Sequence, residues 1–367
     1  MKSTILKLLP SLCLLCLAVW ALPASAQPRP RLGLHFSAGQ PTLTLTGEMG
    51  TVYSIQYATG LSSTNLWVER TLLQAQGASI FWSDPSASST GQRFYRAVSV
   101  PAPVDPNLVF IQPGTFTMGS PMNEARRNSD EVQHSVTISR GFWMERFLVT
   151  QGDYLAVVGS NPSFFNGFQT NWPAPPGGTN YGTDLSRPVE TVSWYNATNY
   201  CALRTQQERA AGLIPTNYVY RLPTESEWEY ADRAGTTTAF YLGCDLSSGQ
   251  ANFDGRYEYD CSAGENNSDG IYLIQTTAVG SYAANPWGLY DMIGNVFEWC
   301  QDWYGAYPIG SVTDPQGPAT GSYPVLRGGN WEFHADDCRS AVRYYDYYPG
   351  DGGFLIGFRV LLAPGQP

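Results

Sequence analysis

The segment GLYDMIGNVFEW, residues 288–299, combines acids that could bind a cation with side chains typical of a protein core. Its internal glycine and asparagine would interrupt a helix, and its many bulky apolar residues are not typical of a surface loop. Asp291 and Glu298 could hold a metal cation. Alternatively, Glu298 pairs with an arginine such as Arg327 or Arg359, and Asp291 caps a turn. The spacing of the acids leaves both readings open.

The net charge excludes one class of partner. The chain has 21 basic and 31 acidic residues, and both of its lysines, Lys2 and Lys7, lie at the N-terminus. Without them 19 basic residues face 31 acids, a formal charge of −12. Nucleic-acid binding needs a basic surface, so we expect no nucleic acid as a partner. An acidic surface is compatible with bound cations.

The order of composition along the chain predicts five parts. Residues 1–26 read as a signal peptide, because two lysines precede an apolar run and Ala24-Ser25-Ala26 fits a cleavage site. Residues 27–99 alternate apolar and polar positions between turns, which predicts a small β-sandwich-like module. A proline-rich linker, 100–107, leads to a second domain at 108–362 and a tail at 363–367.

The second domain carries three helix starts. Thr150, Ser193 and Thr224 each precede a segment with helical features, and Glu227 lies at capping-box spacing from Thr224. After Gly235 the helical signals end, and more than a hundred residues rich in Gly, Asn, Asp, Tyr and Trp follow. Loops this long need fixing by disulfides, bound ions or aromatic packing. The fold class that follows is α+β and loop-rich.

Six segments of the second domain resemble one known family in the same order. The segments are FIQPGTFTMGS, RPVETVSWYNATNYC, YRLPTESEWEYADRAG, GLYDMIGNVFEWCQDW, VLRGGNW and GFRVL. Together they resemble the formylglycine-generating enzyme, or sulfatase-modifying factor, family over residues 108–362. The resemblance implies an irregular domain related to C-type lectin folds. It does not cover the N-terminal module.

The resemblance also implies two calcium sites. The first would use the side chains of Asp291 and Glu298 with the carbonyl groups of Gly294 and Val296. Calcium prefers six to eight oxygens of this mixed kind. The second site would use Asn252, the carbonyl of Phe253 and, as the distant acid, Asp269. Three nearby acids are rivals of Asp269 for that role: Asp254, Glu258 and Asp260.

The copper site of the family's enzymes does not match this chain. The resemblance implies two cysteines five positions apart after the GGS segment, a ligand pair suited to soft Cu(I). Here the first position is Phe333 and the second is Cys338. We therefore expect no working copper centre. If catalysis survives, Cys338 and His334 are the candidate catalytic residues.

Five cysteines remain after the signal peptide, and an exported chain favours disulfides. By resemblance to family members without the catalytic pair, we expect a Cys300–Cys338 bridge. We also expect Cys244–Cys261, because these two bracket the irregular stretch. Cys201 would remain as a buried thiol on a helix.

These observations leave three functional hypotheses. The first is an exported, secreted or periplasmic, calcium-stabilised module without catalysis, which binds a peptide, protein or glycan in a groove near Asn330, Trp331 and His334. The second is an oxidoreductase that acts on a protein cysteine through an altered metal site. The third is a purely structural assembly protein. After signal cleavage none of them involves a membrane.

Overall fold

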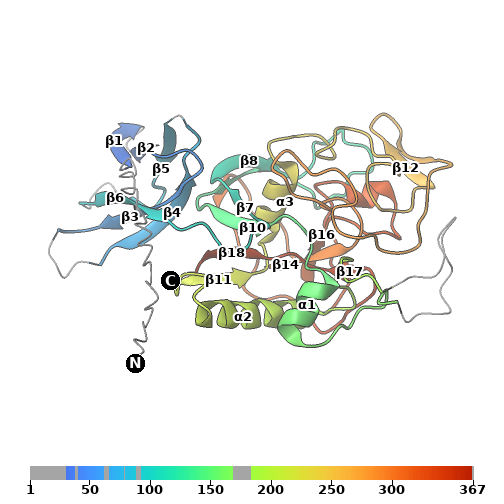
Figure 1. Cartoon of the computed structure of the whole chain (residues 1–367). Helices are drawn as coiled ribbons and strands as arrows, with labels where there is room; N and C mark the ends of the chain where they lie inside the picture. Colours follow the sequence, from blue (N-terminus) through green and yellow to red (C-terminus); the bar gives the residue numbers. More distant parts are fainter. Residues whose placement is uncertain are drawn as a thin grey trace, which may run out of the picture.

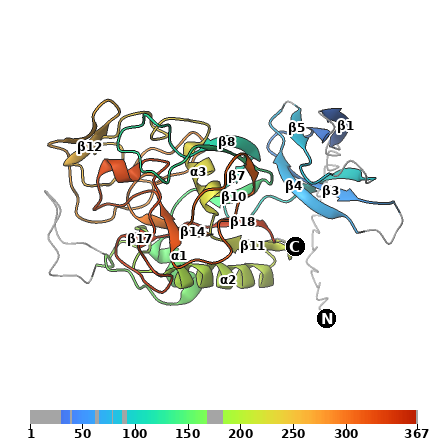
Figure 2. The same cartoon turned by 180° about the vertical axis from the view of Figure 1, so that it is seen from behind.

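The computed structural model describes residues 30–37, 40–61, 66–77, 79–87, 92–167 and 183–365. The predicted signal peptide, residues 1–26, lies outside this range, as does the end of the predicted tail. The chain forms two adjoining lobes, a small β module and a larger mixed domain (Figures 1 and 2). In the described part of the chain, no helix has the length and apolar character needed to cross a membrane.

The N-terminal module is a sandwich of two antiparallel sheets, ordered β1-β2-β5 and β4-β3-β6. Alternating strand residues turn inward, and the buried set includes Leu43, Leu45, Ile55 and Leu73. The β-sandwich-like module predicted from the alternation is therefore present. The strands are β1 (Arg31–Ser37), β2 (Gln40–Thr46), β3 (Val52–Ala58), β4 (Val68–Gln74), β5 (Ile80–Ser83) and β6 (Phe94–Val100).

In the residues that the structure describes, the larger domain contains four small sheets and long irregular connections, which confirms the α+β, loop-rich class. The sheets are β11-β18-β10-β7, β15-β9-β8, β16-β14-β17 and β12-β13. Their strands are β7 (Leu108–Ile111), β8 (Gly114–Met118), β9 (His134–Ile138), β10 (Phe142–Glu145), β11 (Tyr218–Arg221), β12 (Tyr257–Asp260), β13 (Gly264–Asn267), β14 (Phe297–Trp303), β15 (Val312–Thr313), β16 (Pro324–Arg327), β17 (Ile356–Gly357) and β18 (Leu361–Pro364).

The three predicted helix starts are confirmed. The helices are α1 (Gln151–Val158), α2 (Trp194–Ala210) and α3 (Glu225–Arg233), and their N-caps are Thr150, Ser193 and Thr224. Each N-cap forms a capping box, in which the cap hydroxyl and the third helical side chain satisfy each other's backbone N–H groups. After α3 the only described helical piece is the short 3-10 helix η1 (Ala335–Cys338). The long irregular region predicted after Gly235 is thus present.

Candidate functional site

The segment 288–299 runs as a buried loop into strand β14. Asp291, Gly294 and Asn295 all adopt positive φ angles of 55°, 74° and 67°. Gly294 is required here, because a Cβ atom would lie 2.3 Å from the carbonyl oxygen of Asn252. The loop therefore lies against the chain at Asn252, which places Gly294 of the first candidate calcium site next to Asn252 of the second.

Glu298 is neutralised by an arginine. Its carboxylate accepts two hydrogen bonds from Arg359, at 2.6 Å and 2.8 Å, and neither side chain is exposed. Arg359 also donates to the carbonyl oxygen of Tyr290 at 2.9 Å. The other candidate partner, Arg327, pairs with Glu229 and lies near Glu225. Of the two readings of Glu298, the structure contains the ion pair.

Asp291 lies close to this pair but keeps part of its bonding capacity. One of its oxygens accepts from the backbone N–H of Gly280 at 2.7 Å. Burial raises the pKa of Asp291 to about 6, and the nearby negative charge of Glu298 adds to the effect, whereas Arg359 opposes it. Asp291 thus has the turn-capping contact expected of it, in a place where a cation would also lower its free energy.

A second cluster of oxygens surrounds Asn252. The Asn252 side-chain amide donates to the carbonyl oxygen of Gln275 at 2.9 Å, and the Asn252 carbonyl accepts from Asn295 at 2.7 Å. The side-chain oxygens of Asn252, Gln275 and Thr277 are buried and have no hydrogen-bond donor in the described part of the chain. Buried oxygens without donors are rare in proteins, and a hard cation would satisfy them.

Gln275 and Thr277 were not predicted from the sequence. They occur in a long irregular stretch without a motif; in the folded chain the Gln275 carbonyl contacts Asn252, and Thr277 contacts Asn295. Phe253, whose carbonyl was predicted as a ligand, follows Asn252 and is buried.

The distant acid predicted for this site is not buried as Asn252 is. Asp269 is exposed, whereas Asn252 is 1% exposed, and no hydrogen bond joins them in the described residues. The rival acids are committed to their own neighbours. Asp254 pairs with Arg256 at 2.6 Å, Glu258 accepts from the Ser248 N–H and Asp260 accepts from the Ser262 N–H. Any cation beside Asn252 would therefore rest on neutral oxygens of this region rather than on these acids.

The position of the family's first copper cysteine is filled by an aromatic cluster. The Phe333 ring lies 5.3 Å from that of Phe297 and 5.6 Å from that of Tyr344. Cys338 ends η1 with 1% exposure, and burial raises the pKa of its thiol well above the usual value. His334 stacks on Tyr257 at 3.8 Å. The two residues predicted for an altered catalytic centre thus contribute a buried thiol and a stacked imidazole, and Phe333 adds a phenyl ring.

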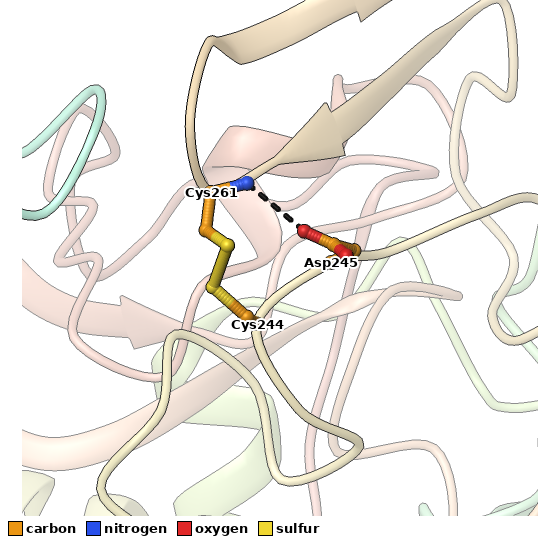
Figure 3. A group of neighbouring side chains, drawn as sticks. All are labelled: Cys244, Asp245 and Cys261. Carbon is orange, nitrogen blue, oxygen red and sulfur yellow. Dashed lines mark hydrogen bonds between the residues drawn. A yellow bond between two sulfur atoms is a disulfide. The ribbon is translucent and has the colours of Figure 1, made fainter.

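One of the two predicted disulfides forms. Cys244 and Cys261 are bridged, and the carboxylate of Asp245 accepts from the Cys261 N–H at 2.9 Å (Figure 3). In the described chain, these three residues are the only group of three or more His, Cys, Asp or Glu whose possible ligand atoms all lie within 4.8 Å of one another. Their sulfurs are joined to each other, so the group offers no thiolate for a metal. A bridge of this kind fits an oxidising compartment.

The predicted Cys300–Cys338 disulfide is wrong, because both residues are free and buried. Cys300 lies in β14, where the charges of Arg327 and Asp302 act on it. The Cys338 sulfur instead packs on Gly329, so closely that a Cβ atom there would lie 2.3 Å away. The two side chains therefore have different neighbours. Cys201 is free and buried, as predicted.

The predicted ligand groove is also wrong for two of its three residues. Asn330 and Trp331 are 0% and 1% exposed, so neither can line an open groove. The Asn330 side-chain oxygen accepts from the N–H groups of Glu332 and Phe333, and the Trp331 indole donates to the Phe354 carbonyl. Both residues shape the turn before η1. Only His334 is partly exposed.

The comparisons with known proteins agree with this architecture. The chain belongs to the sulfatase-modifying factor family: the Sulfatase-modifying factor enzyme 1-like domain matches residues 96–364. It is 36% identical over 218 residues to the formylglycine-generating enzyme of Streptomyces coelicolor, which covers 56% of this chain and 63% of the enzyme. The solved structure of PvdO from Pseudomonas aeruginosa superposes with a TM-score of 0.55 at 29% identity, over 70% of this chain and 93% of PvdO.

The chain is also similar to part of a larger protein. It is 34% identical over 279 residues to the serine/threonine-protein kinase pkn1 of Chlamydia caviae, which covers 71% of this chain. The match spans only 38% of the kinase's own length. The similarity therefore concerns one part of that protein.

Proposed function

We propose that this chain is an exported, calcium-stabilised member of the sulfatase-modifying factor family that binds or assembles partners and does not generate formylglycine. One observation carries the proposal. Phe333 occupies the place of a copper-binding cysteine and packs on Phe297 and Tyr344, while the remaining sulfur, in Cys338, is buried and protonated. Two thiolates for a soft metal cannot come from these groups.

The calcium part of the proposal rests on unequal support at the two sites. Around Asn252, the buried oxygens without donors fit a hard cation, with Gln275 and Thr277 as additional ligands. At Glu298, the guanidinium of Arg359 already supplies the positive charge. We therefore propose calcium beside Asn252 first. Asp291, in the adjoining loop beside Asn295, is the acidic candidate for this ion.

A binding role is favoured by an aromatic surface between β14 and the C-terminal region. Tyr304 and Tyr345 stack at 3.7 Å, and Tyr323 contacts both Tyr345 and Tyr348. Tyr345 and Tyr348 are 40% and 56% exposed. Tyrosines present a large apolar ring with a polar tip, which suits contact with a peptide, protein or glycan. We propose this face in place of the groove at Asn330 and Trp331.

Export is supported by the sequence of residues 1–26 and by the Cys244–Cys261 bridge. Both are expected of a chain that matures in a secreted or periplasmic environment. The oxidoreductase alternative would require a different metal site, and the assembly alternative would require self-association rather than a separate partner.

Anaerobic Cu(I) titration, followed by an assay with oxygen and a cysteine-containing sulfatase peptide, tests the proposal. We expect no tight stoichiometric Cu(I) binding that depends on Cys338, and no aldehyde on the peptide. Cys338→Ala is the informative variant, and Cys201→Ala is its matched control, since both remove one buried thiol. Stoichiometric binding that is lost only in Cys338→Ala, together with peptide oxidation, would defeat the non-catalytic reading.

A further inference from the structure

A cavity of about 550 Å³ lies between the β module and the family domain. Strand β4 forms one wall, with Val68 to Leu72. The opposite wall comes from the family domain: residues 138–142, the N-terminal end of α3, residues 314–316 and the end of β18. The volume lies in the range of small-molecule sites, which often occur where two domains meet. No lining residue belongs to the candidate calcium sites or to the Cys338 region.

The two walls are held together by specific contacts. The Gln112 side-chain amide donates to the Gln74 carbonyl at 2.5 Å, and its oxygen accepts from the Gln74 N–H at 3.2 Å. The Trp82 indole donates to the carbonyl oxygen of Ser139 at 3.1 Å. Leu72 is fully buried and belongs to the same apolar cluster as Trp143 of the family domain. The cavity is thus pre-formed by a docked module.

Most charges around the cavity are already paired. Arg221 donates two hydrogen bonds to Glu227, at 2.6 Å and 2.7 Å. The Asp314 carboxylate accepts from the N–H and hydroxyl of Ser139. These groups have little capacity left for a ligand.

Two opposite charges remain. Glu69 uses one carboxylate oxygen to accept from the Ser54 hydroxyl at 2.5 Å, and its other oxygen is buried without a hydrogen bond. Arg140 is partly exposed and forms no hydrogen bond or ion pair with the described residues. Arg140 is close enough to act electrostatically on Glu69, yet the two do not form an ion pair. Glu69 and Arg140 both line the cavity, and two opposite charges without ion-pair partners suit a ligand carrying both complementary charges.

We infer that this cavity binds a short peptide with free amino and carboxyl ends. The ligand's ammonium group lies beside the Glu69 carboxylate, and its carboxylate accepts from the guanidinium of Arg140. Apolar side chains of the ligand contact the walls at Val68, Ile138 and Pro315. A polyanion is disfavoured, because Glu69 would repel it in the same space. The ligand class is a zwitterion of dipeptide or tripeptide size.

Isothermal titration of the purified chain with the dipeptide alanyl-leucine tests the inference. We expect saturable binding that weakens at least tenfold in Glu69→Gln and in Arg140→Gln. The control Arg96→Gln changes an exposed arginine of the same module that is not among the cavity residues, and it should bind like the unchanged chain. Circular dichroism confirms that each variant is folded.

Blocked peptides assign each contact separately. N-acetyl-alanyl-leucine lacks the ammonium group, so it should bind weakly to the unchanged chain and equally weakly to Glu69→Gln. Alanyl-leucinamide lacks the carboxylate, so Arg140→Gln should not weaken it further. The inference is overturned if folded protein shows no saturable binding of alanyl-leucine, or if blocking either end has the same effect in all variants.

Discussion

Two neighbouring regions of this molecule differ in whether their buried side-chain oxygens have hydrogen-bond donors. At Glu298, a negative carboxylate is matched by Arg359 with two hydrogen bonds and no exposure to water. At Asn252, three neutral side-chain oxygens are buried without donors in the described chain. The Glu298 site therefore holds an internal counter-charge, whereas the neutral oxygens at Asn252 keep open coordination capacity. The spacing of acids in a sequence does not show which acid will be neutralised by a basic side chain of the same protein.

A third buried group has neither solution. Asp232, in α3, is 0% exposed, and neither of its oxygens has a hydrogen bond to the described residues. Burial raises the pKa of Asp232 to about 7; the nearby Ser340 hydroxyl and the charges of Arg233 and Arg327 oppose the shift, and the charge of Glu229 adds to it. A carboxyl group with a pKa raised in this way holds its proton at mildly acidic pH, which lowers the cost of burying it there.

Breaking the ion pair should have the largest effect. Arg359→Met leaves the charge of Glu298 buried without a partner, which typically costs about 3–5 kcal/mol of unfolding free energy. The double change Arg359→Met with Glu298→Leu should recover much of the loss. Denaturant unfolding measures both. We expect calcium not to restore the single variant. If calcium did restore it, the ion would occupy the Glu298 site, and the contrast between the two sites would disappear.

Removal of calcium should have the next largest effect. A ligand of the folded state at 100 times its Kd stabilises by about 2.7 kcal/mol. Thermal unfolding with and without a chelator should therefore show a lower Tm in the chelator. Asn252→Ala should remove this dependence, whereas the exposed control Asn267→Ala should keep it. A Tm that is unchanged after thorough chelation would refute the proposal that calcium binds at Asn252.

Asp232→Asn should have the smallest effect, confined to one pH range. Because its pKa is raised on folding, Asp232 stabilises the protein most below its unfolded pKa and loses that contribution as the pH rises through about 7. The variant should therefore be more stable than the unchanged chain at pH 8 and not at pH 4.5. We expect a gain of about 1 kcal/mol, since the new amide hydrogens also lack acceptors. Equal stability differences at both pH values would show that Asp232 does not hold the proton.

The sequence predicted the local structure well where one short pattern decides it. The caps at Thr150, Ser193 and Thr224 lie within three residues of their partners, so the helix starts were readable. The disulfide between Cys244 and Cys261 closes a segment only 17 residues long. The family was also readable, because its segments keep their order over the whole domain.

Predictions failed where distant segments decide the outcome. A disulfide between Cys300 and Cys338 was predicted from the resemblance to other family members. In the structure the Cys338 sulfur packs on Gly329 and has a different environment from Cys300. Asn330 and Trp331 were expected at a surface, and the fold buries both beneath neighbouring loops. Gln275 and Thr277 carry no pattern that points to Asn252. Such residues meet only through tertiary contacts.

The docking of Leu72 into the larger core has a practical consequence for dividing this chain. The prolines after Val100 suggest a hinge at which the N-terminal lobe could be cut away. A fragment that began there would lose Leu72 and the indole of Trp82. It would therefore expose to water the apolar surface that these side chains cover in the intact chain. Such a fragment should aggregate or bind detergents, and neither behaviour would then be a property of the intact chain.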